Sequence, residues 1–410
     1  MKPFSLRLLA LALAGAPVLA ACAADDDQPL GPGAGGELFA RYVSIGNSIT
    51  AGYQAGGIDS TLQNDAYPVL LAARAGARFD APLIFGPGCP RPYVAPLTAA
   101  PAPPAGAPCY RATTPRIVNN LAVPGETIGD LLNLTASPSV RQLHRLLIGD
   151  RTQLQAMEEA DPTFVSVWIG NNDALNAAVT ANPAALTPQA LFAARVDSVT
   201  ARIAAENPRD VLLIGVVDPN VVPLLQPGAF FYLAYANAVA AGQPSPFGRP
   251  VLPDCAPGTP GGSRRVSFAV LSVPAAQIPA ISCGPTAPFV LTAEEGQAIS
   301  QRVAAFNASL QAAATAGGRS WTYVDPNTIL APFAGDPARI RRCQGLATAA
   351  TPAQFATAVQ NTCPSFSPAV GFGTLFSFDA VHPSPEAHRI LANALATIIN
   401  QKHGLSLATS

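Results

Sequence analysis

Short strand-like runs alternate with amphipathic helical stretches along most of this chain, and this alternation constrains the fold more than any other feature. Each run is rich in β-branched or aromatic residues and ends near Gly, Pro, Asn or Asp, which is typical of β-strands. The five runs are residues 41–45, 117–122, 164–169, 211–217 and 321–324. They predict five strands of one sheet.

Helical patterns occupy residues 66–75, 151–159, 188–207, 292–316 and 384–400. The fourth stretch begins with Thr292-x-x-Glu295, a capping box that marks the start of a helix. In the last stretch the apolar residues recur at helical spacing: Ile390, Leu391, Leu395, Ile398 and Ile399. Strands that alternate with helices favour a mainly parallel sheet covered on both faces. We therefore predict a three-layer α/β/α fold with five strands.

Three proline- or cysteine-bearing stretches interrupt this pattern, near residues 80–116, 218–290 and 330–376. Within the first, the prolines from Pro101 to Pro108 are unsuited to a helix or a central strand. We interpret the three stretches as surface insertions on a single domain that spans residues 37–410. They account for its length, which is large for one domain.

The first residues are typical of a secretory signal peptide, which we assign to residues 1–21. Lys2 and Arg7 lead into an apolar run that ends near Ala21 and is too short to span a bilayer. Residues 22–36 are rich in aspartate and glycine, as in a flexible tether. No later stretch is long and apolar enough to predict a transmembrane helix.

The signal peptide closes on Leu19-Ala20-Ala21-Cys22, which resembles the lipobox of bacterial lipoproteins. The resemblance implies that Cys22 becomes the lipidated first residue of the mature chain. An exported lipoprotein of the cell envelope would follow, held by Cys22 on the periplasmic or cell-surface face of a bacterial membrane. The alternative is a plain signal peptide followed by an incidental cysteine.

The other six of the seven cysteines form an even set in a chain that we expect to be exported, which favours disulfides. They fall into three couples of neighbours: Cys89 and Cys109, Cys255 and Cys283, and Cys343 and Cys363. We expect these couples to pair, each closing a loop worth about 3 kcal/mol. A metal site is the disfavoured alternative, because the chain has no C-x-x-C pair and only four histidines.

Charge argues against nucleic acid as a partner. The formal net charge is −1, and only 12% of the residues are charged. A chain of this composition lacks the basic face that nucleic acid requires.

The first predicted strand ends in Gly46-Asn47-Ser48, which is either an ordinary turn or a serine presented for reaction. A serine hydroxyl needs an adjacent base, usually a histidine oriented by a carboxylate. In the segment "SFDAVHPS", His382 follows Asp379 by three residues, so one loop can supply both groups. The alternative for this pair is a capped turn.

Two further segments complete a pattern. "NNLAVPGET" contains Gly125 after a predicted strand, and "VSVWIGNND" ends another strand with Asn172. With Ser48 and the Asp379–His382 loop, these segments occur in an order that resembles the SGNH, or GDSL-type, serine hydrolase family. The first motif departs from that family's Gly-Asp-Ser-Leu, because Asn47 replaces the acidic residue.

The resemblance implies a role for each matching residue. Ser48 would be the nucleophile, His382 the general base, and Asp379 the group that orients the histidine. The oxyanion hole would consist of the backbone N–H groups of Ser48 and Gly125 and the side-chain amide of Asn172. No metal and no organic cofactor would be required.

A flavodoxin-like strand order, 2-1-3-4-5, would bring these segments together. In open α/β sheets, ligands gather at the carboxyl ends of the strands where the strand order reverses. With this order the reversal lies between the strand that ends at Ser48 and the strand that ends at Asn172. Gly125 ends the strand on the other side of Ser48.

The remaining candidates are interpreted as structural. We expect His388 to be structural on the final helix, His144 and His403 to be solvated, Asp173 to anchor its loop, and Asn120 to fix the loop that carries Gly125. The aromatic stretch at residues 230–235 is interpreted as core, with an acyl-binding wall or lid as the alternative.

Taken together, the sequence predicts a lipid-anchored serine esterase or lipase that hydrolyses carboxylic esters through a Ser-His-Asp triad and an acyl-enzyme. Lipid esters, short-chain esters and acetylated glycans all remain open as substrates. Two other functions also remain open: an acyltransferase with the same active site, and a non-catalytic surface-binding lipoprotein on the same fold.

Overall fold

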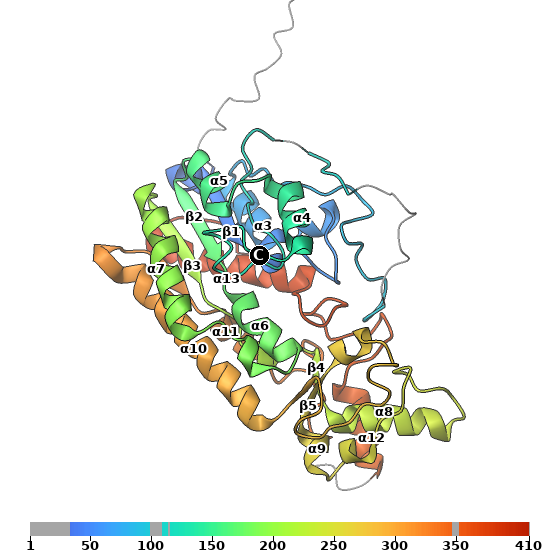
Figure 1. Ribbon diagram of the computed structural model, residues 1–410. Coiled ribbons are helices and arrows are strands. Elements are labelled where there is room, and N and C mark those ends of the chain that lie inside the picture. The colour runs from blue at the N-terminus through green and yellow to red at the C-terminus, as the bar shows by residue number, and fades with distance from the viewer. Residues whose placement is uncertain (1–32, 99–108, 114, 347–351, 410) are drawn as a thin grey trace, which may run out of the picture. The chain divides into compact units, whose positions relative to one another are not determined.

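Four parallel strands form the central sheet of the computed structural model, which describes residues 33–98, 109–113, 115–346 and 352–409 (Figure 1). In order across the sheet they are β1 (Tyr42–Gly46), β2 (Phe164–Trp168), β3 (Asp210–Ile214) and β7 (Thr322–Val324). Each strand overlaps a run predicted from the sequence, so the α/β fold with a mainly parallel sheet is confirmed.

The fifth predicted strand, at residues 117–122, is not a regular strand. It meets the outer edge of β1 through one parallel bridge, between Ser44 and Asn120. Ser44 N donates to Asn119 O at 2.8 Å, and Leu121 N donates to Ser44 O at 2.9 Å. Asn119 also uses its side chain on neighbouring backbone, donating to Tyr42 O and accepting from Asp80 N. The segment thus takes the expected place in the strand order, held by a few backbone bonds to β1 and by these side-chain bonds instead of a regular strand.

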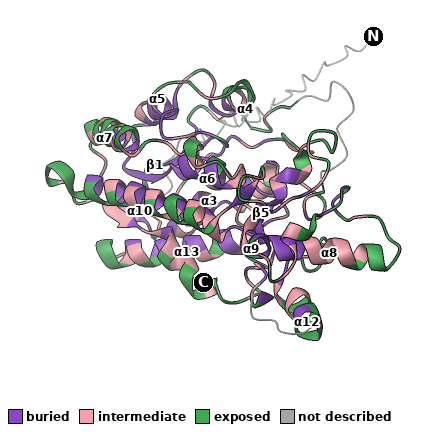
Figure 2. Ribbon diagram, turned by 60° about the horizontal axis from the view of Figure 1, so that its bottom comes forward, coloured by how far each residue is buried: buried purple, intermediate pink, exposed green. Residues whose placement is uncertain are grey.

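Helices cover both faces of the sheet, and every residue of β1, β2 and β3 is buried. On one face, α5 (Gln153–Glu159), α7 (Gln189–Ala205) and α10 (Ala293–Thr315) pack against strand residues such as Val43 and Val165. On the other, α3 (Tyr67–Ala75) and α13 (Pro385–His403) pack against Tyr42 and Trp168. Figure 1 shows α7 and α10 side by side, and Figure 2 shows the buried stripes of the helices turned inward. This is the predicted three-layer arrangement.

These five helices coincide with the five helical patterns of the sequence. The predicted capping box starts α10, where Glu295 N donates to Thr292 Oγ1 at 3.2 Å and Thr292 N to Glu295 Oε2 at 2.9 Å. The structure adds helices that were not predicted: α1 (Ser48–Ala51), α2 (Ser60–Asn64), α4 (Pro138–Ile148), α6 (Asn171–Val179), α8 (Gly228–Ala240), α9 (Pro260–Ser263), α11 (Pro326–Leu330) and α12 (Pro352–Thr362).

The two later insertions share a second hydrophobic cluster. Residues 218–290 contain α8 and two strands of a small antiparallel sheet, which is formed by β4 (Leu225–Pro227), β5 (Arg265–Ser267) and β6 (Val290–Leu291). Phe231 of α8 and Phe268 pack here with Phe372 from the other insertion. The aromatic stretch at residues 230–235 lies in α8. Phe230 and Phe231 are core, as the sequence favoured, and residues 232–235 are partly buried against the same cluster.

Three disulfides join the couples of neighbouring cysteines. Cys89 pairs with Cys109, Cys255 with Cys283, and Cys343 with Cys363, with Cα–Cα separations of 5.7, 5.0 and 4.0 Å. Each bond closes a loop within one of the three insertions. Each insertion is therefore braced by its own disulfide.

The expected signal peptide and Cys22 lie outside the described residues, as does the proline run from Pro101 to Pro108. At the end of the expected tether, Gly35 N donates a hydrogen bond to Ala75 O at 2.8 Å, at the end of α3. None of the helices in the described ranges has the length and apolar character that crossing a membrane requires.

Candidate active site

The nucleophile candidate lies where β1 ends and α1 begins. Asn47 caps α1, and its Oδ1 accepts a hydrogen bond from Ile49 N at 3.3 Å. Ser48, the first residue of this helix, is buried but for 7% of its surface. Asn47 therefore caps this helix as an aspartate side chain also would, but without a negative charge.

Asp379 and His382 form a hydrogen-bonded pair in the loop before α13. His382 Nδ1 lies 2.8 Å from Asp379 Oδ2, and the backbone N–H of His382 donates to Asp379 Oδ1 at 2.8 Å. Because Nδ1 is engaged by the carboxylate, Nε2 is the ring nitrogen that can accept a proton. The Asp-x-x-His spacing thus places the two side chains as the sequence predicted.

Asp379 is held in its ionised form. Burial raises the pKa of Asp379, but the charge and hydrogen bonds of His382 and the backbone N–H of Val381 outweigh that effect and lower it to about 2. The carboxylate also accepts hydrogen bonds from Ser377 Oγ at 3.0 Å and Gly56 N at 2.7 Å. A negative charge is therefore fixed beside the imidazole at neutral pH.

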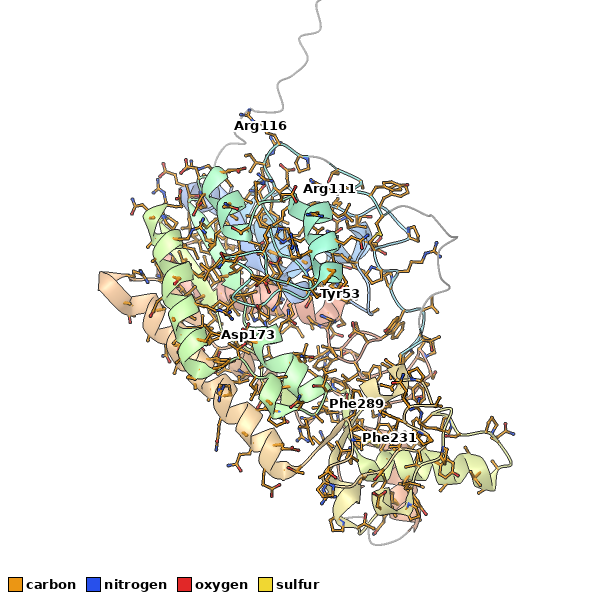
Figure 3. All side chains as sticks on the ribbon, in the orientation of Figure 1. Tyr53, Arg111, Arg116, Asp173, Phe231 and Phe289 are labelled. Carbon is orange, nitrogen blue, oxygen red and sulfur yellow. A yellow bond between two sulfur atoms is a disulfide. The ribbon has the colours of Figure 1, made fainter. Side chains whose placement is uncertain are left out.

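Sequence reasoning missed the loop that supports this pair from the other side. The ring of Tyr53 lies 4.9 Å from that of His382, centroid to centroid, and Tyr53 Oη donates to Gly56 O at 2.5 Å. Figure 3 labels Tyr53 near the central sheet, well apart from Phe231 of the second hydrophobic cluster. Its place five residues after Ser48 was the only available signal.

Ser48, His382 and Asn172 line one cavity at the carboxyl edge of the sheet. Asp379 lies behind His382, and neither Asp379 nor Gly125 is among the lining residues. Between the described atoms of Ser48 Oγ and His382 there is no hydrogen bond; such bonds are often long before substrate binds. The rest of the wall is mostly apolar and includes Ile49, Trp168, Leu175, Val217, Val222, Leu330, Leu375, Phe376, Val381 and Leu391.

Gly125 adopts a backbone conformation that favours glycine. Its φ is +88°, and a Cβ added there would lie 2.7 Å from a methyl group of Val140 in α4. The need for glycine thus comes from the turn and from the packing of α4.

The start of α6 is tied to the loop that follows Gly125. Asn172 Nδ2 donates to Glu126 O at 2.7 Å, and Asp173 Oδ2 accepts from Ile128 N at 3.0 Å. Asp173 is labelled in Figure 3, and its burial raises its pKa to about 6. Asn120 Nδ2 donates to Thr50 O at 2.9 Å. Both residues thus anchor loops, as predicted.

Of the other three histidines, one fits its predicted role and two are less exposed to solvent than predicted. His388 is buried, burial lowers its pKa to about 3, and its Nδ1 accepts from Tyr67 N at 3.3 Å, which fits a structural role. The prediction that His144 is solvated is wrong, because it is 2% exposed and bonded to Glu126. His403 is only partly exposed and pairs with Asp210 at 2.8 Å.

Metal ligands do not cluster in the part of the chain that the structure describes: no group of three or more His, Cys, Asp or Glu side chains could hold an ion there.

Comparison with solved structures finds matches at low sequence identity. An extracellular lipase from Streptomyces rimosus is 17% identical, with a TM-score of 0.37, over 87% of this chain and 98% of that one. A catalytic mutant of an acetylxylan esterase from Geobacillus stearothermophilus is 13% identical, with a TM-score of 0.36, over 93% and 100%. A search of curated proteins finds no match.

The comparison with protein families is more specific. The profile of the GDSL-like lipase/acylhydrolase family matches residues 42–395, from the first residue of β1 into α13. That range contains Ser48, Gly125, Asn172 and the Asp379–His382 pair. The chain therefore belongs to the GDSL-like lipase/acylhydrolase family of carboxylic ester hydrolases.

Proposed function

We propose that the chain is a serine esterase that hydrolyses carboxylic esters through an acyl-enzyme on Ser48. The observation that supports this most directly is that Ser48, His382 and Asn172 line one cavity while an ionised Asp379 orients His382. A nucleophile, a base, an orienting carboxylate and an amide donor are the groups that acyl transfer requires.

In the proposed reaction, Ser48 Oγ attacks the ester carbonyl carbon and its proton passes to His382 Nε2. The developing oxyanion is stabilised by the N–H groups of Ser48 and Gly125 and by Asn172 Nδ2. His382 then protonates the leaving alcohol as the acyl-enzyme forms. A water molecule, deprotonated by His382, releases the carboxylic acid and restores Ser48.

The apolar wall of the cavity favours an acyl chain as its occupant. Val222 belongs to the second insertion, and Leu330, Leu375 and Phe376 belong to the third. These side chains offer hydrocarbon surface and no hydrogen-bond donors, so an alkyl chain gains more from the site than a polar acyl group does. We therefore propose esters with hydrocarbon acyl chains, as in lipid or short-chain esters, ahead of acetylated glycans.

We also propose that the enzyme is exported and anchored through lipid on Cys22. Three disulfides favour an oxidising compartment outside the cytoplasm. The lipobox-like Leu19-Ala20-Ala21-Cys22 supports the anchor.

A panel of p-nitrophenyl esters of increasing chain length tests the activity. Wild type should hydrolyse them, and mass spectrometry after rapid quenching should find the acyl group on Ser48. Ser48→Ala should be inactive, whereas Ser198→Ala, which alters an exposed serine on α7, should match wild type. A folded wild-type protein without turnover would favour a non-catalytic binding protein. Ester formation in the presence of an alcohol would favour an acyltransferase.

A further inference from the structure

Glu126, the residue after Gly125, is buried and uses every acceptor atom that it has. Only 1% of its surface is exposed. Its Oε1 is bonded to His144 Nδ1, and its Oε2 accepts from Gln153 Nε2 at 2.6 Å. Its backbone O accepts from Asn172 Nδ2 at 2.7 Å. One residue therefore contacts three separate elements around the proposed oxyanion hole.

Gln153 connects this carboxylate to the strand that carries the nucleophile. It is completely buried at the first turn of α5, and its Nε2 donates to both Glu126 Oε2 and Gly46 O, the latter at 2.8 Å. Its Oε1 accepts from Gly46 N, also at 2.8 Å. Gly46 is the last residue of β1 and lies two residues before Ser48. The position of the Ser48 backbone is thereby linked to the Glu126 side chain.

The carbonyl of Glu126 fixes the third donor. The amide nitrogen of Asn172 has two hydrogens, and the bond to Glu126 O uses one of them. The other hydrogen is then oriented by a planar amide that cannot rotate without losing the first bond. The position of the Asn172 amide is therefore fixed by Glu126, the residue that follows Gly125.

His144 holds the Glu126 carboxylate in place. His144 Nε2 lies 2.6 Å from Arg151 O, and because a carbonyl only accepts, that nitrogen carries a hydrogen. Burial lowers the pKa of His144, but the hydrogen bond and charge of Glu126 raise it by more, so it lies above its ordinary value. The network draws on α4, α5 and α6, and every polar side-chain atom of Glu126, Gln153 and His144 has a hydrogen-bond partner.

We propose that Glu126 is a positioning residue for ester hydrolysis, which sets the Ser48 N–H, the Gly125 N–H and Asn172 Nδ2 relative to one another. This rests on the proposed function. A buried carboxylate costs more than an apolar side chain of similar size, and the hydrogen bonds to His144 and Gln153 offset that cost while they hold Glu126 in place. Displaced oxyanion donors weaken binding of the transition state much more than binding of the ground-state ester.

The test compares two substitutions of similar size. Glutamine can keep the network, since its NH2 can donate to His144 Nδ1 while its oxygen accepts from Gln153. Leucine cannot. We expect Glu126→Leu to lower kcat about 10- to 100-fold with KM within about threefold of wild type, and Glu126→Gln to recover kcat to within about threefold.

A second buried carboxylate provides the control. Asp210 is 1% exposed and bonded to Lys402 and His403. It starts β3, so it lies at the amino ends of the strands, whereas the cavity lies at their carboxyl ends. Asp210→Leu should lower stability and leave kcat per folded molecule unchanged. Equal kcat in Glu126→Leu and wild type, or equal losses in the leucine and glutamine variants, would overturn the proposal.

Amide hydrogen exchange gives a readout that does not depend on turnover. Exchange at residues 123–128 should accelerate in Glu126→Leu and stay near wild type in Glu126→Gln. Unchanged exchange in Glu126→Leu would overturn the positioning role even if wild type is active. An inactive wild type with the expected exchange pattern would instead contradict the esterase proposal and leave the network's role in ordering this loop supported.

Discussion

His382 Nδ1 lies 2.8 Å from Asp379 Oδ2, and the same carboxylate oxygen accepts a hydrogen bond from Gly56 N at 2.7 Å. The pair is therefore held from two directions, by its own loop and by the segment that follows Ser48. This cross-link between residues more than 300 positions apart makes the imidazole orientation a property of the whole domain. It also allows the proposed mechanism to be tested one group at a time.

Ser48→Ala and His382→Ala should each lower kcat by several orders of magnitude, because nucleophile and base act as one unit. For the same reason the double variant should lose little more than the worse single variant. The measurement is kcat on p-nitrophenyl esters, with circular dichroism to show that each variant is folded. Near-wild-type turnover in folded Ser48→Ala would exclude it as the nucleophile.

Asp379→Asn should remove a pH-dependent contribution to stability. The pKa of Asp379 is about 2 in the folded protein, below the ordinary value of 3.8, so its contribution is present above pH 4 and is lost as the pH falls towards 2. The shift corresponds to about 2 kcal/mol. Urea unfolding at several pH values should show the difference between wild type and variant shrinking on acidification. A difference that does not depend on pH would contradict this assignment.

Gly125→Ala should lower both stability and kcat, because a Cβ there meets Val140 at 2.7 Å in a conformation with φ of +88°. We expect a loss of about 1 to 3 kcal/mol in the free energy of unfolding. Adding Val140→Ala should relieve the steric part and leave the backbone strain. A double-mutant cycle measures the two parts; additive losses would show that Val140 is not the obstacle.

Non-reducing peptide mapping of the native protein should find Cys89–Cys109, Cys255–Cys283 and Cys343–Cys363. The second bond lies within the second hydrophobic cluster, where both cysteines are fully buried. Replacing Cys255 and Cys283 by serine should therefore destabilise residues 218–290 by about 3 kcal/mol or more. Detection of a bond between different couples would contradict the local pairing.

Cys22→Ser should abolish the lipidated mature form, which detergent partitioning and mass spectrometry of the mature amino terminus would detect. Acyl chains on Cys22 would supply membrane affinity at about 0.8 kcal/mol per buried methylene. A chain that begins at Pro32 should stay in the aqueous phase and hydrolyse water-soluble esters. An unmodified mature terminus at another residue would refute the anchor without affecting the esterase proposal.

Local patterns were sufficient to predict the layers of the fold. Composition and periodicity show directly which residues along a segment are buried. This applies to the apolar runs at 41–45 and 164–169 and to the helical spacing at 384–400. The capping box at Thr292 and Glu295 is likewise local and was found where expected. The candidate triad residues were identifiable because their motifs combine residue type with short spacing.

Tertiary structure decided what depends on contacts between distant segments. Residues 117–122 meet β1 through a single bridge, and the side chain of Asn119 bonds to the backbone of Tyr42 and Asp80 there. His144 and Glu126 have no local signature, since each is polar and 18 positions separate them. Both side chains leave water only when the chain folds. Because burying an unpaired charge costs free energy, they are buried as a hydrogen-bonded pair. Sequence periodicity reports which faces are buried, but it cannot report which buried polar groups will meet.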